Sequence, residues 1–231
     1  MKDQVVMITG AAGVLGRAVA EAFDRAGARL ALVDLREDAL KSAYPSTGAG
    51  ATYAADLTDQ AAAARTVEQV VARFKRVDAL CNIAGGFRMG TPVHATDDAT
   101  WDLLLGLNVG TMLNAVRAVV PRMLEGGGGR IVNVGAMGGM AGRANMGAYS
   151  ASKSAVIRLT EAMAAELRDK GINVNCVLPS VIDTPANRAD MPKANPAKWV
   201  APADLAAVIR FLCSDDARAL HGAAIPVVGL S

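Results

Sequence analysis

The chain has 231 residues, of which 52% are hydrophobic and 20% are charged, and its formal net charge is only +2. This length suits one large α/β domain, and the apolar fraction is enough for a substantial buried core. Because the charges nearly balance and no basic block is longer than a dipeptide, we expect neither nucleic acid nor a membrane surface as a partner. No apolar run has the length expected of a transmembrane helix.

Short β-branched runs alternate along the chain with alanine-rich helical stretches. The predicted strands are residues 5–8, 30–33, 52–54, 79–83, 130–134, 174–178 and 224–228. The predicted helices are residues 16–26, 60–74, about 97–123 in one or two pieces, 149–170 and 202–213, with a polar, helix-prone segment after the second strand. This alternation is typical of a parallel sheet covered on both faces. We therefore predict one doubly wound α/β domain over residues 1–231, with a seven-stranded parallel sheet and helices on both faces.

The beginning of the chain and its cysteines indicate the compartment. The first four residues lead directly into the apolar run at residues 5–8, which is followed by glycines, as in a first strand and unlike a signal peptide. Three cysteines lie far apart in apolar contexts, at Cys81, Cys176 and Cys213. Isolated cysteines of this kind fit the reduced core of a cytoplasmic protein. The two histidines are isolated as well, so we expect no metal site.

A glycine-rich loop follows the first predicted strand, with Gly10, Gly13 and Gly16 at three-residue spacing. Such a loop between a strand and a helix allows a tight turn, a close backbone approach to a pyrophosphate, and free amides at the helix N-terminus that face its charge. The strand–turn–helix context favours a dinucleotide-binding site. The alternative interpretation is a packing turn without a ligand.

The acid that ends the second strand, Asp34, predicts the type of dinucleotide. A carboxylate at this distance from the glycines can accept hydrogen bonds from both adenosine ribose hydroxyls, and it repels the 2′-phosphate of NADP(H). This favours NAD(H), although Arg17 and Arg36 are close enough in sequence to complicate the preference. The alternative interpretation of Asp34 is a strand-end residue that caps the next helix.

These residues and several later motifs resemble the short-chain dehydrogenase/reductase family over nearly the whole chain, which implies a Rossmann fold. Residues 9–16 resemble its cofactor loop, with Val14 in place of a frequent glycine, and residues 82–85 resemble its Asn-Asn-Ala-Gly motif, with Ile83 as a departure. Residues 179–184 resemble the segment that touches the nicotinamide half. The cofactor-binding residues implied by this resemblance are Gly10, Ala12, Gly13, Val14, Leu15, Gly16, Asp34, Asp56, Leu57, Asn82, Ala84, Gly85, Tyr149, Lys153, Pro179, Ile182 and Thr184.

Tyr149 and Lys153 match the Tyr-x-x-x-Lys signature of that family, and a four-residue separation on a predicted helix places them on one face. A tyrosine that exchanges a proton near pH 7 needs its pKa lowered by about three units, or roughly 4 kcal/mol. A neighbouring Lys153 ammonium favours the phenolate, so Tyr149 is the predicted general acid or base. The resemblance adds Asn108, which would hold a water or backbone group in the proton path. The alternative is an ordinary half-buried tyrosine and a solvated lysine.

The resemblance also draws attention to a missing hydroxyl. Most family members carry a serine thirteen residues before the tyrosine, where it donates to the substrate carbonyl, and this chain has Ala136 there. Loss of such a donor costs roughly 2.7–4 kcal/mol in an enzyme that depends on it. Three explanations stay open: an easily reduced conjugated substrate such as a quinonoid pterin, a replacement donor such as Asn145 or a backbone amide, or an NAD(H)-binding sensor or structural subunit without turnover.

Residues at about 184–201, which include three prolines, are predicted to cover a small-molecule substrate as a lid. An apolar pocket for a flat ligand would be formed by Ala136, Met137, Phe87 and Met146. Core packing is the alternative for each of these residues. Arg88, Arg143 and Arg188 could meet an anionic or carbonyl-rich substrate, with solvated surface as the alternative.

Three features are similar to the dihydropteridine reductases within that family: residues 84–87, the Gly-Ala pair before Met137, and residues 183–199. We therefore predict an NAD(H)-dependent oxidoreductase that transfers a hydride between nicotinamide and a carbonyl, alcohol or conjugated quinonoid substrate, with dihydropteridine reductase activity as the narrower alternative. The resemblance also implies that the long helices pack against symmetry mates in a homodimer or homotetramer.

Overall fold

A seven-stranded sheet organises this computed structural model, which describes residues 1–46, 48 and 50–230. Its strands are β1 (Val5–Thr9), β2 (Arg29–Asp34), β3 (Ala51–Ala54), β4 (Ala79–Asn82), β5 (Gly129–Val134), β6 (Ile172–Pro179) and β7 (Ala224–Val227). Within the described residues the strand order is β3-β2-β1-β4-β5-β6-β7, and each neighbouring pair is parallel. The predicted doubly wound parallel sheet is therefore confirmed.

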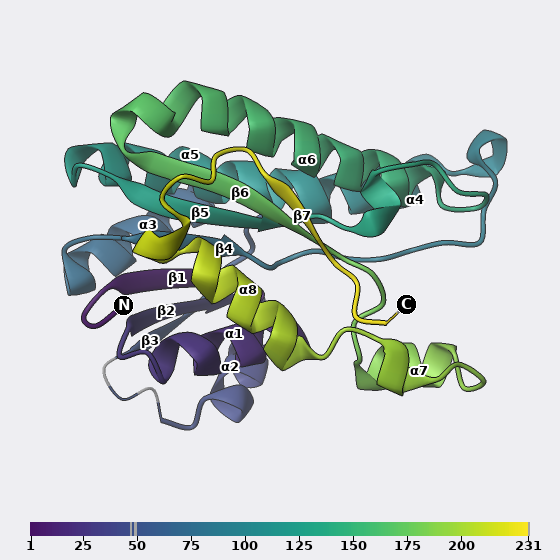
Figure 1. Cartoon of the computed structure of the whole chain (residues 1–231), viewed down its shortest axis with the longest axis horizontal. Helices are drawn as coiled ribbons and strands as arrows, with labels where there is room; N and C mark the ends of the chain where they lie inside the picture. Colours follow the sequence, from purple (N-terminus) through teal and green to yellow (C-terminus); the bar gives the residue numbers. More distant parts are fainter. Residues whose placement is uncertain (47, 49, 231) are drawn as a thin grey trace.

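Helices cover both faces of the sheet (Figure 1). One face carries α3 (Gln60–Phe74), α5 (Thr111–Glu125) and α6 (Gly147–Leu167), and the other carries α1 (Val14–Asp24), α2 (Glu37–Ala43) and α8 (Pro202–Leu212). Two shorter helices, α4 (Asp98–Leu105) and α7 (Pro185–Asp190), lie toward the right of Figure 1, at the end of the molecule where the candidate site is found.

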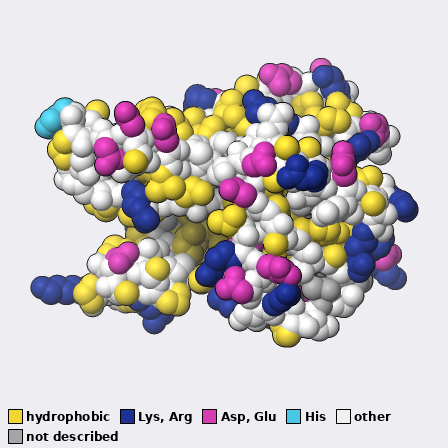
Figure 2. Space-filling view, turned by 180° about the vertical axis from the view of Figure 1, so that it is seen from behind, with side chains coloured by type: hydrophobic (Ala, Val, Ile, Leu, Met, Phe, Trp, Pro, Cys, Tyr) yellow, Lys and Arg dark blue, Asp and Glu magenta, His cyan; other side chains and the backbone are white. Residues whose placement is uncertain are grey.

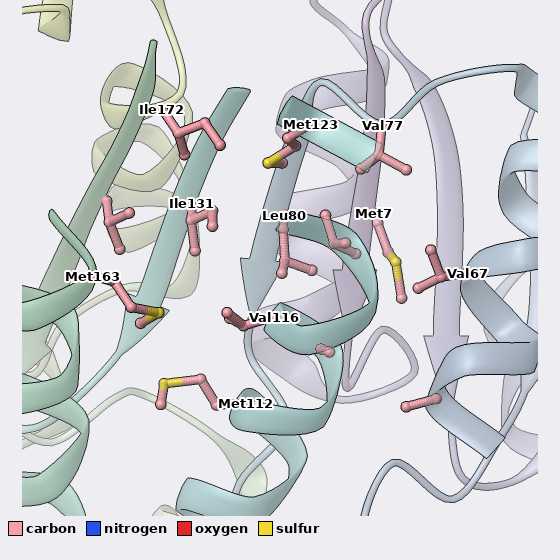
Figure 3. Close-up of a cluster of buried hydrophobic side chains, with 14 of the residues drawn as sticks. Met7, Val67, Val77, Leu80, Met112, Val116, Met123, Ile131, Met163 and Ile172 are labelled. Carbon is pink, nitrogen blue, oxygen red and sulfur yellow. The ribbon is translucent and has the colours of Figure 1, made fainter. Parts of the chain in front are cut away.

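The strands are buried on both faces, so they contribute side chains to two separate hydrophobic clusters. Met7, Leu80 and Ile131 belong to the cluster beneath α3, α5 and α6 (Figure 3). Their sequence neighbours Ile8 and Cys81 belong to the cluster beneath α1 and α8. A large apolar side chain that is fully buried contributes roughly 1.5–3 kcal/mol to folding. This two-sided burial is why the strands have near-continuous apolar sequences.

The predicted elements are present, with end points that differ by at most three residues. Helix α1 begins two residues earlier than expected because Gly13 is its N-cap. The long helix after residue 97 is in two pieces, α4 and α5, which are joined by a π-helical turn at Gly106–Gly110. Helix α7 is an addition to the predicted lid. It begins where Thr184 accepts a hydrogen bond from the Asn187 amide at 3.1 Å.

The helical stretch from Asp98 to Glu125 contains an apolar window of 18 residues with a mean hydropathy of 1.6, so it is long and apolar enough to cross a membrane by length and composition alone. The expectation that no segment has that length is therefore wrong. In the fold, 44% of this apolar window is buried inside the protein. Asn108 and Asn114 within the stretch are buried and donate hydrogen bonds to neighbouring loops. We interpret the stretch as a core helix.

Candidate active site

The strand order reverses between β1 and β4, and ligands of open α/β sheets bind beyond the carboxyl ends of the strands at such a switch point. Since all pairs are parallel, the loops after β1 to β6 begin at this same end. The fold thereby brings together the predicted cofactor residues Gly10, Ala12, Gly13, Val14, Leu15, Gly16, Asp34, Asp56, Leu57, Asn82, Ala84, Gly85, Pro179, Ile182 and Thr184.

The backbone of the glycine loop turns tightly against the loop after β4 and the N-terminus of α1. Gly10 has a φ of +63°, and a Cβ there would lie 2.9 Å from the amide nitrogen of Ala84. A Cβ on Gly16 would overlap the carbonyl oxygen of Gly10. Helix α1 begins after Gly13 without a side-chain cap and has no acidic residue in its first turn. Its N-terminal amides and dipole therefore favour an anion.

Asp34, at the end of β2, supports this loop. Its Oδ2 accepts a hydrogen bond from the Ala12 amide at 3.0 Å, and its Oδ1 accepts a long one from the Arg36 amide at 3.5 Å. Helix α2 begins after Arg36 without a side-chain cap. Asp34 therefore braces the glycine loop and does not cap the helix, contrary to the alternative interpretation of its sequence position.

Tyr44, just after α2, is absent from the predicted site residues. Its hydroxyl donates a hydrogen bond to the Ala11 carbonyl oxygen at 2.7 Å, which ties α2 to the glycine loop. Burial raises the pKa of Tyr44 to about 12, while the Arg17 charge acts in the opposite direction. The hydroxyl therefore keeps its proton as a donor. Tyr44 lies 33 positions from its partner, so no local sequence pattern indicates this contact.

Hydrogen bonds from neighbouring elements hold the loops that follow β3 and β4. Asn114 of α5 donates to the carbonyl oxygen of Leu57 at 3.0 Å. Thr9, at the end of β1, accepts hydrogen bonds from the amides of Ile83 and Ala84 at 3.0 and 3.1 Å. Both loops contain predicted cofactor-binding residues. Neither Asn114 nor Thr9 is among the residues predicted from sequence, because their role is visible only in the folded chain.

Asn108 lies in the π-helical turn and holds the loop after β4. Its Oδ1 accepts from the Gly86 amide at 2.9 Å, and its Nδ2 donates to the Gly86 carbonyl oxygen at 3.1 Å and to Ser152 Oγ at 3.0 Å. A Cβ on Gly85 would lie 2.7 Å from Asn108 Oδ1 and 3.4 Å from Lys153 Nζ. Gly85, Asn108 and Lys153 are therefore close together, and Asn108 binds the backbone of Gly86.

Tyr149 and Lys153 lie one turn apart on α6. Lys153 is buried, and its Nζ donates to the Val134 carbonyl oxygen at 2.8 Å. Burial lowers the pKa of Lys153 to about 8 and raises the pKa of Tyr149 to about 12. The expectation that Lys153 lowers the pKa of Tyr149 is therefore wrong for the protein alone. Desolvation of the phenol is the dominant cause, and the ammonium is directed at a carbonyl oxygen.

A cavity of about 200 Å³ lies beside Tyr149. Its walls come from the segment after β4, from α4 and from the start of α6, and consist of Arg88, Met89, Thr91, Thr96, Thr100, Leu104, Asn145, Met146, Gly147, Ala148 and Tyr149. Phe87 packs edge-on against the Tyr149 ring, with the ring centroids 4.7 Å apart. Figure 2 shows the surface hollowed between the lobe that contains α7 and the body of the molecule.

The predicted substrate-pocket residues are only partly brought together. Met146 lines the cavity and Phe87 contacts Tyr149. Met137 packs against the hydrophobic cluster beneath α5 and α6, because that position lets its apolar side chain leave water. Ala136 is buried, with 6% of its surface exposed. Neither Ala136 nor Met137 lines the cavity.

The two ends of the segment predicted as a lid are hydrogen-bonded to each other. Ile182 and Val200 form an isolated parallel bridge, and the Asp183 amide donates to the Val200 carbonyl oxygen at 2.9 Å. Arg188 of α7 donates two hydrogen bonds to the Asp183 carboxylate, at 2.6 and 2.8 Å. This pairing lowers the pKa of Asp183. The charge of Arg188 is therefore already matched within the lid.

Across the described residues, no group of three or more His, Cys, Asp or Glu side chains could hold a metal ion. The cysteines at positions 81, 176 and 213 are buried and free. Cys81 and Cys213 meet between β4 and the end of α8, with their Sγ atoms 4.0 Å apart. Their burial agrees with the core role expected from sequence.

Comparisons with known proteins place this geometry in a family. Residues 4–195 match the family model described as short chain dehydrogenase. The chain belongs to the short-chain dehydrogenase/reductase family. It is 38% identical over 185 residues to sorbitol dehydrogenase of Cereibacter sphaeroides, an alignment that covers 79% of this chain and 72% of that protein. It is 33% identical over 242 residues to D-threitol dehydrogenase of Mycolicibacterium smegmatis, with coverage of 99% and 93%.

Solved structures agree with this assignment. NAD⁺-bound xylitol dehydrogenase has a TM-score of 0.92 and 28% sequence identity to this chain, and the match covers 99% of this chain and 98% of that one. The protein is therefore an oxidoreductase of the short-chain dehydrogenase/reductase family, and it has the Rossmann fold of that family.

Within this short-chain dehydrogenase/reductase, the residues around Ala136 show which side chains could replace the missing serine. The turn at Met137–Gly139 that follows Ala136 contains no side-chain hydrogen-bond donor. Asn145, suggested from sequence as a replacement, lines the same cavity as Tyr149. It has a φ of +61°, a conformation that is uncommon for a residue other than glycine. Its role as a replacement side-chain donor stays a prediction.

Proposed function

We propose that this short-chain dehydrogenase/reductase transfers a hydride between NAD(H) and a carbonyl or alcohol group, with Tyr149 as the proton donor or acceptor. One observation carries the proposal. Tyr149 lines a cavity one helical turn from the buried Lys153, at the same end of the sheet as the glycine loop. A protein that only senses a dinucleotide needs neither a substrate-sized cavity nor a phenol beside a buried lysine.

The chain's own residues fit a nicotinamide dinucleotide. The glycine loop and the N-terminus of α1 would hold the pyrophosphate, Asp34 the adenosine ribose, and Lys153 the nicotinamide ribose. Bound NADH would supply the hydride for reduction of the substrate carbon, and NAD⁺ would accept it in the reverse direction. The Asp34 carboxylate, fixed by the Ala12 amide at 3.0 Å, would repel a 2′-phosphate, and this supports NAD(H) over NADP(H).

Tyr149 is suited to donate a proton to a carbonyl oxygen. Burial raises its pKa, so the phenol is protonated at neutral pH, and its release of the proton requires nearby positive charge that stabilises the phenolate. The nearby Lys153 ammonium would then stabilise the phenolate. Asn108 joins Gly86 to Ser152 of α6 and therefore acts as a positioning residue between the loop after β4 and the proton-transfer pair.

The decisive experiment replaces Tyr149 with Phe. We expect turnover to fall by about 10²–10⁴-fold, the usual contribution of a general acid or base, while NADH binding measured by fluorescence titration changes little. Acceptors should include simple ketones, quinones and quinonoid dihydropterin. A Tyr149→Phe variant that keeps wild-type turnover would contradict the proposed role. A wild-type protein that binds NADH but oxidises it with none of these acceptors would instead be a sensor or structural subunit.

A conjugated quinonoid substrate, such as quinonoid dihydropterin, is the second candidate. It is favoured by Ala136, which places a methyl group where a carbonyl-binding serine would otherwise lie. A conjugated acceptor needs less polarisation of its carbonyl than an isolated ketone does. We expect Ala136→Ser to raise the kcat for simple ketones and to leave the kcat for quinonoid dihydropterin nearly unchanged. Equal effects on both substrates would speak against this candidate.

The cofactor preference has its own test. The ratio of kcat/KM for NADH to that for NADPH should be well above one in the wild type and should fall in Asp34→Asn, because the carboxylate charge is then lost. Wild-type preference for NADPH would overturn the role proposed for Asp34 and would point to Arg17 and Arg36 instead.

A further inference from the structure

Arg88 gives the cavity beside Tyr149 a positive charge. It is the cation among the lining residues, all of which the structure describes, and none of them is an aspartate or glutamate. The other polar lining side chains are neutral, namely Thr91, Thr96, Thr100 and Asn145. Thr96 already donates to the Pro92 carbonyl oxygen at 3.2 Å. The cavity therefore offers a cation and neutral hydrogen-bonding groups, without an acid that would repel an anionic ligand.

The structure separates Arg88 from the two other arginines considered from sequence. Arg188 is paired with Asp183 through two hydrogen bonds, and Arg143 does not line the cavity. Arg88 donates to the Phe87 carbonyl oxygen at 3.3 Å, and none of the salt bridges between described residues involves it. Among the residues that line the cavity, Arg88 is thus a cation that is not paired with an acid of the described residues.

We propose that the substrate is a short oxo acid or the matching hydroxy acid, with its carboxylate bound by Arg88 and its carbonyl or hydroxyl group facing Tyr149. The planar guanidinium matches a carboxylate through two parallel hydrogen bonds. Met89, Leu104 and Met146 supply apolar wall for the carbon chain, and a cavity of about 200 Å³ suits a chain of a few carbons. This inference rests on the proposed role of Tyr149 as the group at the reacting oxygen.

Binding of matched acids and esters tests the inference without requiring turnover. Acetoacetate, 4-oxopentanoate and 5-oxohexanoate would each be titrated into the NAD⁺-loaded protein by calorimetry and compared with their methyl esters, which lack the charge. For the chain length that fits, we expect the acid to bind about 10- to 100-fold more tightly than its ester, the range for a charge-assisted hydrogen-bonded pair. The advantage should shrink as ionic strength rises.

Variants assign the acid preference to one residue. Arg88→Leu should remove the difference between acid and ester, and Arg88→Lys should keep part of it, since it retains the charge without the planar fork. Arg143→Leu is the matched control, an exposed arginine outside the cavity, and should leave the preference unchanged. Equal binding of acid and ester at all three chain lengths, or an equal loss in Arg143→Leu, would overturn the inference.

These titrations, together with assays of NADH oxidation by the same acids and esters, distinguish failure of this inference from failure of the proposed function. An acid preference that depends on Arg88, in a protein that never oxidises NADH with any of the oxo acids, supports the anion site and contradicts hydride transfer. Turnover of acids and esters at equal kcat/KM supports hydride transfer and contradicts the anion site. Melting temperatures of the three variants would exclude loss of folding as the cause of lost binding.

Discussion

At the scale of single residues, Lys153 is a cation placed where a charge is unfavourable. Only 6% of its surface is exposed, and desolvation lowers its pKa to about 8. The hydrogen bond from its Nζ to the Val134 carbonyl oxygen offsets part of this cost. Such a placement is expected of a group retained for its position near a reacting centre more than for stability.

Lys153 should therefore make stability depend on pH. The folded-state pKa lies below the ordinary value of 10.5, so between about pH 8 and pH 10.5 the unfolded chain binds more protons than the folded one. Because of Lys153, the free energy of unfolding then increases with pH, by on the order of 3 kcal/mol over the whole interval. Urea denaturation of the wild type and of Lys153→Met would measure the free energy of unfolding at pH 7 and pH 9.5. Between these pH values, the stability of the wild type should increase relative to that of the variant.

The comparison between the wild type and the variant removes the contributions of groups that do not interact with Lys153. Burial raises the pKa of Tyr149 and of the Cys176 thiol, so both act in the opposite direction at alkaline pH. The Lys153 charge lowers the pKa of Cys176, so its loss enlarges the expected difference between the two proteins. Lys170→Met is the control, since Lys170 is exposed and its removal should leave the pH dependence unchanged. A difference between wild type and Lys153→Met that is the same at both pH values would contradict the placement of a desolvated ammonium.

Tyr44 and Tyr53 provide a matched pair of hydroxyl deletions. Tyr44 donates to the glycine loop, whereas the Tyr53 hydroxyl is buried without a hydrogen-bond partner among the described residues. Tyr44→Phe should lower the free energy of unfolding by about 1 kcal/mol and weaken NADH binding, seen as a higher KM for NADH at unchanged kcat. Tyr53→Phe should leave stability unchanged or raise it. Equal effects of both variants on the KM for NADH would contradict a positioning role for Tyr44.

The residues of the candidate site could be predicted from sequence where their pattern is local. Tyr149 and Lys153 are four positions apart, and Asn108 follows from the resemblance to a family. The pKa direction of Tyr149 could not be predicted, because desolvation depends on what covers the phenol. Tyr44 was not predicted either, since its partner is remote in sequence and becomes a neighbour only after the sheet forms.

At the scale of elements, the turn between β1 and α1 depends on the absence of side chains. Because a Cβ on Gly16 would overlap the Gly10 carbonyl oxygen and lie 2.8 Å from the Ala11 Cα, backbone atoms would have to move. Gly16→Ala should therefore weaken NADH binding at least tenfold and cost about 1–3 kcal/mol in unfolding free energy, as overpacking does. Fluorescence titration and urea denaturation would measure the two effects.

Gly142→Ala is the control for this substitution, since a Cβ on Gly142 would meet nothing within 4 Å. It should be neutral in both measurements. If Gly16→Ala bound NADH as tightly as Gly142→Ala, the close approach of loop and helix would not matter for the cofactor site.

The strands could be predicted from sequence because burial on both faces produces apolar runs, and the larger helices from their alanine-rich composition. Two features needed the structure. The π-helical turn at Gly106–Gly110 is a change of hydrogen-bond pattern inside a continuous helix, which composition does not mark. Helix α7 is only six residues long and lies among prolines, so its hydrophobic pattern is too short to identify.

At the scale of the whole molecule, large apolar side chains remain exposed on the helices that the resemblance assigns to subunit contacts. Trp101 and Leu103 of α4 are each 42% exposed, and Leu124 of α5 is 41% exposed. We propose that these helices pack against a second copy of the chain. Light scattering should then give a mass two or four times 23.8 kDa, and Trp101→Lys should shift it toward the monomer. A wild-type mass of one chain would contradict the proposal.

The helical stretch of α4 and α5 has a further consequence through its two asparagines. Asn108 holds the backbone of Gly86 near the proton-transfer pair, and Asn114 holds that of Leu57 beyond β3. Six residues separate the two side chains, or about 9 Å along a helix axis. The stretch therefore fixes the spacing between the loops that follow β3 and β4. A subunit contact that shifted it along its axis would displace both loops together.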